Sequence, residues 1–382
     1  MLISDIIGQD VAKDFLVKAV SQNRLSHAQL FIAPEGTGGL PLALAFSQYL
    51  VCTDRQGNDA CGNCGPCKRA AQLIHPDIHF SYPVIPRKTG DKPVATDYAA
   101  EWREFVAQYP YGIAFDWLQF IGAENRQGNI PAAEYQDILR KLNLKSYESE
   151  YKILVMWYPE FLGKEGNILL KLIEEPPPKT LFILIAENVD QLLETLISRT
   201  QPVRLHFLSL SEIAGALVAR AGAEESEAFR LATLAEGSYR EALQLMQHSM
   251  GDDLLEVLRD WLNAALRVRP RELQEWIDEM AKTGRERQKQ FLRYFLHQIE
   301  HAIRLKYLTG QELPFPEKER QFAASLQKMA DSRKLTRLMK ALDDACFHIE
   351  RNVNAKILFH ALSIRMRDIL KGRALPLEEV TG

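Results

Sequence analysis

The chain has 382 residues, of which 46% are hydrophobic and 25% are charged, and its formal net charge is −3. These values are ordinary for globular proteins, so they exclude disordered and fibrous classes and argue against a surface that is basic all over. At roughly 100–200 residues per domain, we expect two or three domains. No apolar run approaches the ~20 residues of a membrane span, and MLISDIIGQD lacks the pattern of a signal peptide, so we expect a cytoplasmic protein.

Helical and strand patterns alternate over residues 1–207. A helix is predicted over residues 9–22, where apolar side chains recur at helical spacing. Short apolar runs predict strands at 28–33, 78–82, 153–157, 181–186 and 203–207, and more helices are predicted at 132–142 and 166–175. The runs ILVMW and LFILIA are apolar without alternation, as expected when helices cover both faces of a strand. We therefore predict a wound α/β domain with a parallel sheet.

The pattern becomes helical throughout after residue 207. Ser209 and Glu212 can form a capping box at the start of a helix, and two more helices fit before Gly251. Longer amphipathic segments follow, with interruptions at three places: Pro270, Gly284 and residues 310–316. The sequence thus predicts a small helical domain over 208–252 and a second all-helical domain over 253–382.

An insertion over residues 83–122 interrupts the α/β domain. Prolines and charges open it, and seven aromatic side chains follow: Trp102, Phe105, Tyr109, Tyr111, Phe115, Trp117 and Phe120. Such density is compatible with a surface on which nucleic-acid bases stack. We favour a small local core packed against the main domain, because aromatic side chains usually bury.

Four of the five cysteines lie within sixteen residues: Cys52, Cys61, Cys64 and Cys67. A C-x-x-C turn lets two thiolates reach one ion, and the glycines between these cysteines permit a tight backbone. Four thiolates complete a tetrahedral site and leave no position for substrate, so we predict one structural zinc ion in a module over about 52–67. The alternative is a redox pair, although four thiols outnumber the two that such a pair needs.

A glycine-rich turn, PEGTGGLP, links the first predicted strand to a helix. A phosphate-binding loop belongs at this position, and its segment here is Gly36, Thr37, Gly38 and Gly39. A working loop needs a lysine for the phosphates and a hydroxyl for magnesium, but those places hold Gly39 and Leu40. The strand that should end in acidic residues ends in Trp157 and Tyr158. We predict that the chain neither binds ATP productively nor hydrolyses it; alternatively, GTGG only caps the helix.

Several segments carry a family resemblance: IIGQDVAKDFLVKAV, RLSHAQLF, the four cysteines, Ile74-His75-Pro76-Asp77, NILLKLIEEPPPKTLFILIAEN, ETLISRTQ, EGSYREAL and ERNVNAKILFHALSIRM. Together they resemble the delta-prime subunits of bacterial DNA polymerase III clamp loaders, within the AAA+ superfamily. Neighbouring motor subunits share much of LLKLIEEPPPKTLF but keep the lysine and threonine of the phosphate loop. The resemblance therefore implies a non-ATPase member with an AAA+ sheet domain, a helical lid over 208–252 and a helical collar for oligomerisation over 253–382.

The resemblance also implies which residues act. The family's Ser-Arg-Cys motif reads Ser198-Arg199-Thr200 here, and its arginine acts in trans on ATP bound to the adjacent motor subunit. A guanidinium is always charged and offers a planar fork of donors to the γ-phosphate, whereas the alternative for Arg199 is a surface ion pair. Arg240 stands where the family's nucleotide-sensing arginine lies, or it ties two domains together.

The implied function is to help the ATP-driven loading of the sliding clamp onto primed DNA, as a component of the DNA polymerase III holoenzyme. The implied partners are the motor (gamma/tau) and delta subunits and, through the assembly, the sliding clamp and primer–template DNA, with no membrane. Two alternatives stay open, namely a motor ATPase with a variant phosphate loop and a zinc-containing module that binds nucleic acid. Lys68 and Arg69 lie beside Asp54 and Asp59, a weak electrostatic footprint for DNA.

Overall fold

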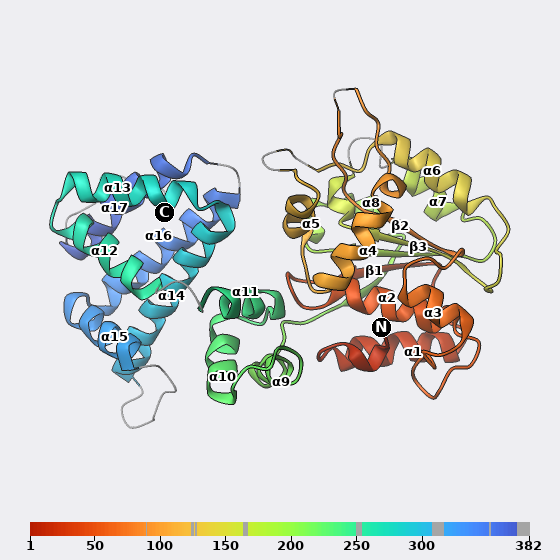
Figure 1. Cartoon of the computed structure of the whole chain (residues 1–382), viewed down its shortest axis with the longest axis horizontal. Helices are drawn as coiled ribbons and strands as arrows, with labels where there is room; N and C mark the ends of the chain where they lie inside the picture. Colours follow the sequence, from red (N-terminus) through yellow and green to blue (C-terminus); the bar gives the residue numbers. More distant parts are fainter. Residues whose placement is uncertain are drawn as a thin grey trace. The chain divides into compact units, whose positions relative to one another are not determined.

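Figure 1 shows a computed structural model of the chain, which describes residues 1–88, 90–123, 126, 128–162, 167–249, 254–307, 317–350 and 353–372. The chain divides into two compact units, Met1–Met246 and Gln247–Gly382. The first unit holds the predicted α/β domain together with most of the predicted lid. The boundary predicted at residue 207 therefore falls inside one compact unit, and the division into three domains stays a prediction.

A five-stranded sheet forms the centre of the first unit: β1 (Ala28–Ile32), β2 (Ile78–Ser81), β3 (Lys152–Trp157), β4 (Thr180–Ala186) and β5 (Gln201–Arg204). The order is β2-β3-β4-β1-β5, and all neighbouring strands are parallel, which confirms the predicted wound parallel sheet. The predicted bounds of the last strand, 203–207, were wrong. β5 is an edge strand with three of its four residues exposed, so it has no continuous apolar run, and Pro202 is tolerated there.

Helices cover both faces of the sheet: α1 (Asp10–Ser21), α2 (Gly39–Val51), α3 (Gly65–Ala71), α6 (Ala132–Leu142), α7 (Asn167–Glu174) and α8 (Glu194–Ile197). Alternate residues of a strand face opposite sides. Ile153 and Val155 of β3 pack in one cluster with α1 and α2, whereas Leu154 and Met156 pack in another with α6, α7 and α8. Two buried faces explain why this strand is apolar at consecutive positions (Figure 1).

Three short helices follow the sheet, and we call them the lid helices: α9 (Leu210–Ala221), α10 (Glu225–Leu234) and α11 (Tyr239–Ser249). The predicted capping box starts α9, because the Glu212 N–H donates to Ser209 Oγ at 3.3 Å and the Ser209 N–H donates to Glu212 Oε2 at 2.7 Å. Gly222 ends the helix with φ +69°, a left-handed conformation that glycine adopts without strain.

The second unit consists of helices: α12 (Leu254–Leu266), α13 (Pro270–Lys282), α14 (Arg285–Tyr307), α15 (Glu317–Met329), α16 (Ser332–Glu350) and α17 (Ala355–Leu370). Its core contains Trp261 stacked on Trp276, with ring centroids 5.2 Å apart. Pro270 begins α13 and Gly284 precedes α14, as predicted, while the predicted break at 310–316 lies outside the described residues. None of the helices in the described part of the chain is long and apolar enough to cross a membrane.

The insertion contains a 3-10 turn, η2 (Ala95–Tyr98), and two helices, α4 (Ala99–Gln108) and α5 (Ala114–Phe120). Trp102, Phe105 and Trp117 are at most 2% exposed, and their ring centroids lie 5.3 to 6.0 Å apart. The Trp117 indole N–H donates to Pro83 O at 2.7 Å. These three buried rings leave no face for a stacking base, whereas Tyr109 is 44% exposed, so the structure supports a small local core around Trp102, Phe105 and Trp117.

Candidate functional sites

Four cysteine thiols converge where α2 ends and α3 begins. The Sγ atoms of Cys52, Cys61, Cys64 and Cys67 all lie within 4.8 Å of one another, and Cys61 Sγ is 4.0 Å from Cys67 Sγ. Zinc–sulfur bonds of about 2.3 Å in a tetrahedron place sulfur atoms roughly 3.8 Å apart. The cluster therefore fits one metal ion with four thiolate ligands, the set that zinc prefers in structural sites.

Backbone groups support these thiols. The Cys61 N–H donates to Cys52 Sγ and the Cys64 N–H donates to Cys61 Sγ, each at 3.3 Å. Burial opposes ionisation of Cys64, but hydrogen bonds from Thr53 and Cys67 outweigh it and lower its pKa to about 6. The donors at Cys64 favour its thiolate, which is the form that binds metal, whereas burial raises the pKa of Cys52 and of Cys67.

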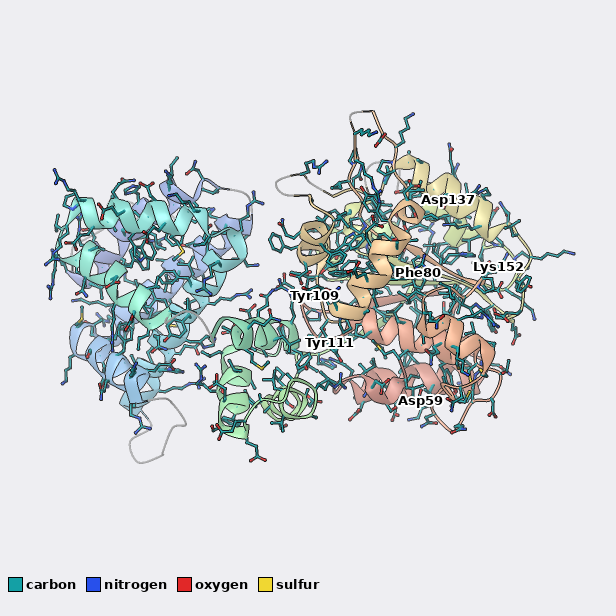
Figure 2. The ribbon with its side chains drawn as sticks, in the orientation of Figure 1. Asp59, Phe80, Tyr109, Tyr111, Asp137 and Lys152 are labelled. Carbon is teal, nitrogen blue, oxygen red and sulfur yellow. The ribbon has the colours of Figure 1, made fainter. Side chains whose placement is uncertain are left out.

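The cysteine segment is tied to the sheet domain on two sides. Asp59 accepts hydrogen bonds from the N–H groups of Ile3 and Ser4, both at 2.9 Å (Figure 2 labels Asp59). Arg69 of α3 forms a fork with Glu148, and its Nε lies 2.9 Å from Glu148 Oε1. Because α3 also carries Cys67, the loop before β3 and the cysteine cluster hold each other in place.

Asp77, in the Ile74-His75-Pro76-Asp77 motif, organises the same loop. Its carboxylate accepts the backbone N–H groups of Tyr147, Glu148 and Ser149 at 2.6 to 2.9 Å. Burial alone would raise the pKa of Asp77, but these three donors outweigh it, so the pKa is lowered.

We expect Asp77→Asn to destabilise the first unit by about 2 kcal/mol at neutral pH, because the charged acceptor of three donors is lost. The folded-state pKa lies below the unfolded value of about 3.9, so the stabilisation is complete above about pH 4 and is lost as pH falls through the folded-state pKa. Urea unfolding of wild type and variant should therefore differ by a constant free energy above about pH 4 and by less below it. A difference that grows in acid would contradict this account.

The turn between β1 and α2, residues 36–39, is here called the glycine loop. Gly36 and Gly38 have φ +68° and +99°, and Thr37 is fully buried, with its hydroxyl donating to Pro34 O at 2.7 Å. A Cβ at Gly39 would lie 2.5 Å from Ala33 Cβ and 3.0 Å from Ile185 Cγ2. A lysine at position 39 therefore requires the surrounding backbone or side chains to shift.

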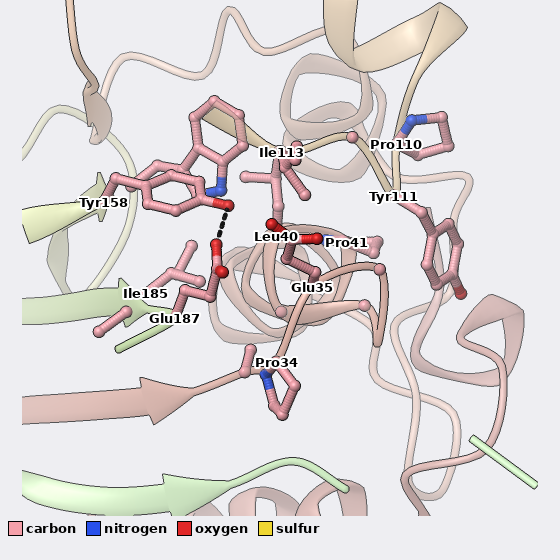
Figure 3. Close-up of a pocket in the computed structure, with 17 residues that line it drawn as sticks. Pro34, Glu35, Leu40, Pro41, Pro110, Tyr111, Ile113, Tyr158, Ile185 and Glu187 are labelled. Carbon is pink, nitrogen blue, oxygen red and sulfur yellow. Dashed lines mark hydrogen bonds between the residues drawn. The ribbon is translucent and has the colours of Figure 1, made fainter. Parts of the chain in front are cut away.

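The space above the glycine loop is nearly filled (Figure 3). About 20 Å³ is open to a water-sized sphere, room for roughly one water molecule. Two carboxylates line it, Glu35 and Glu187, and Glu187 Oε2 accepts the Tyr158 hydroxyl at 2.8 Å. None of the described residues that line this space is a lysine or arginine, so its charge opposes the binding of a triphosphate.

Trp157 and Tyr158 stand where a hydrolase would hold acidic residues. Tyr158 is 8% exposed, and burial raises the pKa of its hydroxyl well above the ordinary value. The next carboxylate along the chain, Glu160, accepts the N–H groups of Glu187 and Asn188 at 2.6 and 2.9 Å, and burial raises its pKa. Glu160 Oε1 thus accepts both backbone N–H groups, while Glu160 Oε2 is buried without a hydrogen-bond partner among the described residues.

Arg199 follows α8 and is partly exposed. Its Nη1 donates to Thr195 O at 2.9 Å, and its guanidinium pairs with Glu174 at the end of α7, the two side chains being 37% and 41% exposed. Ser198 caps α8, and its hydroxyl donates to Thr195 O at 3.2 Å. Thr200 is buried, with its hydroxyl 3.2 Å from Leu196 O, so the third position of the motif faces inward while the arginine faces solvent.

Arg240 lies on the lid helix α11 and is almost fully buried. Its Nε and Nη2 donate to the two carboxylate oxygens of Asp116 on α5, both at 2.5 Å. Sequence reasoning missed Asp116, as well as the partner Glu174 of Arg199. Nothing in the sequence pairs residue 116 with residue 240, because the two lie on separate helices whose packing no local pattern encodes.

The family model described as "DNA polymerase III, delta subunit" matches residues 8–209, just over half of the chain, so the chain belongs to this family. It is 25% identical over 242 residues to the delta-prime subunit of DNA polymerase III from Bacillus subtilis, covering 63% of this chain and 59% of that one. It is 24% identical over 261 residues to the tau subunit of the same organism, covering 66% of this chain and 39% of that one.

A solved structure of a gamma-subunit-related protein from Thermotoga maritima matches with 14% identity and a TM-score of 0.43, covering 94% of this chain and 99% of that one. The sequence alignments to the two Bacillus subtilis subunits span 59% and 39% of their lengths, so this chain matches roughly half of these relatives. Family membership and the five-stranded parallel sheet agree with the AAA+ type fold class expected from sequence. The matched region contains the cysteine cluster, the glycine loop and Arg199.

Proposed function

We propose that this chain is a non-catalytic, delta-prime type subunit of a DNA polymerase III clamp loader in the bacterial cytoplasm. It helps the ATP-driven loading of the sliding clamp onto primed DNA, and it does so without hydrolysing ATP itself. One observation carries the proposal: the pocket above the glycine loop is nearly filled, with about 20 Å³ open, while Arg199 at the edge of the same domain is partly exposed.

Arg199 acts in this proposal on ATP bound to a neighbouring motor subunit. A guanidinium supplied by a neighbour neutralises the charge that develops on the γ-phosphate, so hydrolysis depends on correct assembly. The pair with Glu174 is solvated and therefore weak, so Arg199 leaves it at little cost. Ser198 shapes the turn that presents the arginine.

The four cysteines hold one structural zinc ion in this proposal. The ion fixes the segment that connects α2 to α3, and Arg69 and Asp59 carry that rigidity to the rest of the domain. The second unit, Gln247–Gly382, serves as the collar that joins the corresponding domains of the motor and delta subunits. Contact with the clamp and with primer–template DNA is made through the whole assembly.

Similarity alone does not separate this function from that of a motor subunit, because the relatives include both delta-prime and tau proteins. The nearly filled pocket, the crowded position 39 and the aromatic end of β3 favour the non-catalytic function. A nucleic-acid-binding module is disfavoured, because Arg69 beside the cysteines is paired with Glu148 and the aromatic rings of the insertion core are buried.

Reconstitution tests the proposal. Mixed with motor and delta subunits, the chain should enter one complex of defined mass, and clamp loading onto primed DNA should require it. Failure to enter the complex would refute the proposal. Salt-sensitive binding of the isolated chain to DNA would instead support the nucleic-acid module.

A further inference from the structure

The insertion lies directly over the glycine loop. Pro110, Tyr111 and Ile113 line the cavity above the loop (Figure 3). The Tyr111 ring approaches Gly38 so closely that a Cβ there would lie 2.9 Å from Tyr111 Cε1. Residues of the insertion thus line the space above the glycine loop, and the Tyr111 ring packs against Gly38.

Tyr111 also joins the loop to the lid helices. The Ile7 N–H donates to its hydroxyl at 3.0 Å, and its ring meets that of Tyr239 on α11 edge to face, with centroids 5.1 Å apart (Figure 2 labels Tyr111). Tyr111 and Ile7 belong to the apolar cluster that forms the core of the lid. One side chain of the insertion therefore contacts both the sheet domain and the lid.

Asp116 makes the second contact with the lid, through an ion pair with the buried guanidinium of Arg240. Its side chain is 15% exposed and that of Arg240 is 5% exposed, and the two form the bidentate fork described above. Arg240 lies beside the glycine loop, because a Cβ at Gly36 would lie 3.0 Å from Arg240 Cβ. A guanidinium fork binds carboxylate and phosphate in the same planar manner.

The aromatic core of the insertion packs against the end of β3, where Trp157 stands in place of an acidic residue. The Trp157 ring lies 5.2 Å from that of Trp102 and 5.8 Å from that of Phe105. The position at which a hydrolase would hold magnesium therefore packs against the insertion. The pocket above the glycine loop, the end of β3 and the lid helices therefore all contact the insertion.

We propose that the insertion is an internal substitute for nucleotide. Tyr111 packs over Gly38 at the side of the pocket above the glycine loop, and Asp116 takes the place of a phosphate at Arg240. Together they fix the lid helices against the sheet domain with no nucleotide bound. The proposal rests on contacts within the first compact unit and does not depend on which assembly the chain joins.

Hydrogen exchange of the full chain tests this proposal. Asp116→Asn should accelerate exchange of amides in residues 209–246 and in the glycine loop by at least about tenfold, because the buried Arg240 guanidinium loses its bidentate carboxylate partner, while Glu241 stays 3.9 Å away. Amides of β3 and β4 should keep their wild-type rates. The matched control is Glu101→Gln, which removes an exposed ion pair of the same insertion with Arg87 and should leave lid exchange unchanged.

A double-mutant cycle separates the ion pair from general damage to the fold. Arg240→Gln alone should also accelerate lid exchange, and the double variant should be no faster than the single variants, since the fork between Asp116 and Arg240 is already lost in each of them. Lid exchange at the wild-type rate in Asp116→Asn, or additive effects in the double variant, would overturn the proposal. Faster exchange in β3 and β4 as well would indicate global unfolding. In that case the proposal stands only if the effects of the two substitutions on exchange are non-additive in the double variant.

Discussion

Arg199→Ala should slow ATP hydrolysis at the site next to this chain by about 10³-fold or more in the reconstituted clamp loader, with clamp and DNA present. This is the usual magnitude for an arginine supplied in trans, because no other group replaces the positive charge at the γ-phosphate. Other ATP sites in the assembly continue to turn over, so single-turnover kinetics must resolve the slow fraction. Assembly mass should not change, since Arg199 is 37% exposed and its ion pair with Glu174 is local.

Two further variants define what Arg199 contributes. Arg199→Lys keeps the charge but loses the planar fork, so we expect an intermediate rate. Glu174→Gln removes the local ion pair and should change the rate by less than about fivefold, because exposed pairs contribute at most about 1 kcal/mol. If the complex forms and Arg199→Ala hydrolyses ATP as wild type does, the arginine assignment fails while family membership stands.

Cys64→Ser should abolish stoichiometric metal binding. Wild-type protein, purified reduced and without chelator, should carry about one zinc per chain, and the variant should carry almost none, because three thiolates do not close the tetrahedron. Structural zinc in small domains contributes about 10–16 kcal/mol of binding free energy to folding. We therefore expect the free energy of unfolding of the first unit to fall by at least about 3–4 kcal/mol. For a unit of this size that corresponds to roughly 10 °C in Tm.

The loss of ordered structure in Cys64→Ser should be confined to the cysteine segment. Exchange and proteolysis should increase over residues 52–67, while the second unit still joins the assembly. Cys346→Ser on α16 is the matched control and should keep the full metal content, since Cys346 lies outside the thiol cluster. Metal analysis that finds no zinc in wild-type protein would contradict the structural role of the cluster.

Sequence patterns predicted those features that depend on neighbours along the chain. The apolar runs at 153–157 and 181–186 are strands buried on both faces. They were predictable because a strand buried on both faces needs apolar residues at consecutive positions. Ser209 and Glu212 formed the expected capping box, and the four cysteines met at one point because short spacing constrains where their thiols lie.

Features that depend on packing between distant segments were not predictable. The pair of Asp116 with Arg240 and the approach of Tyr111 to Gly38 arise because the insertion folds back over the pocket, and no periodicity in the sequence records that. The edge strand β5 was misplaced for a related reason. An exposed edge needs no apolar run, so the predicted strand, Val203–Phe207, starts two residues and ends three residues after the observed one.

Binding of ATP to the isolated chain tests the central claim most directly. Isothermal titration with ATP and magnesium at up to millimolar concentration, on protein whose folding is verified by thermal unfolding, measures whether the chain has a nucleotide site of its own. We expect neither measurable binding nor hydrolysis, because little space is open above the glycine loop and two carboxylates line it. Micromolar binding, or hydrolysis above the level of a matched blank, would contradict the account and restore the motor interpretation.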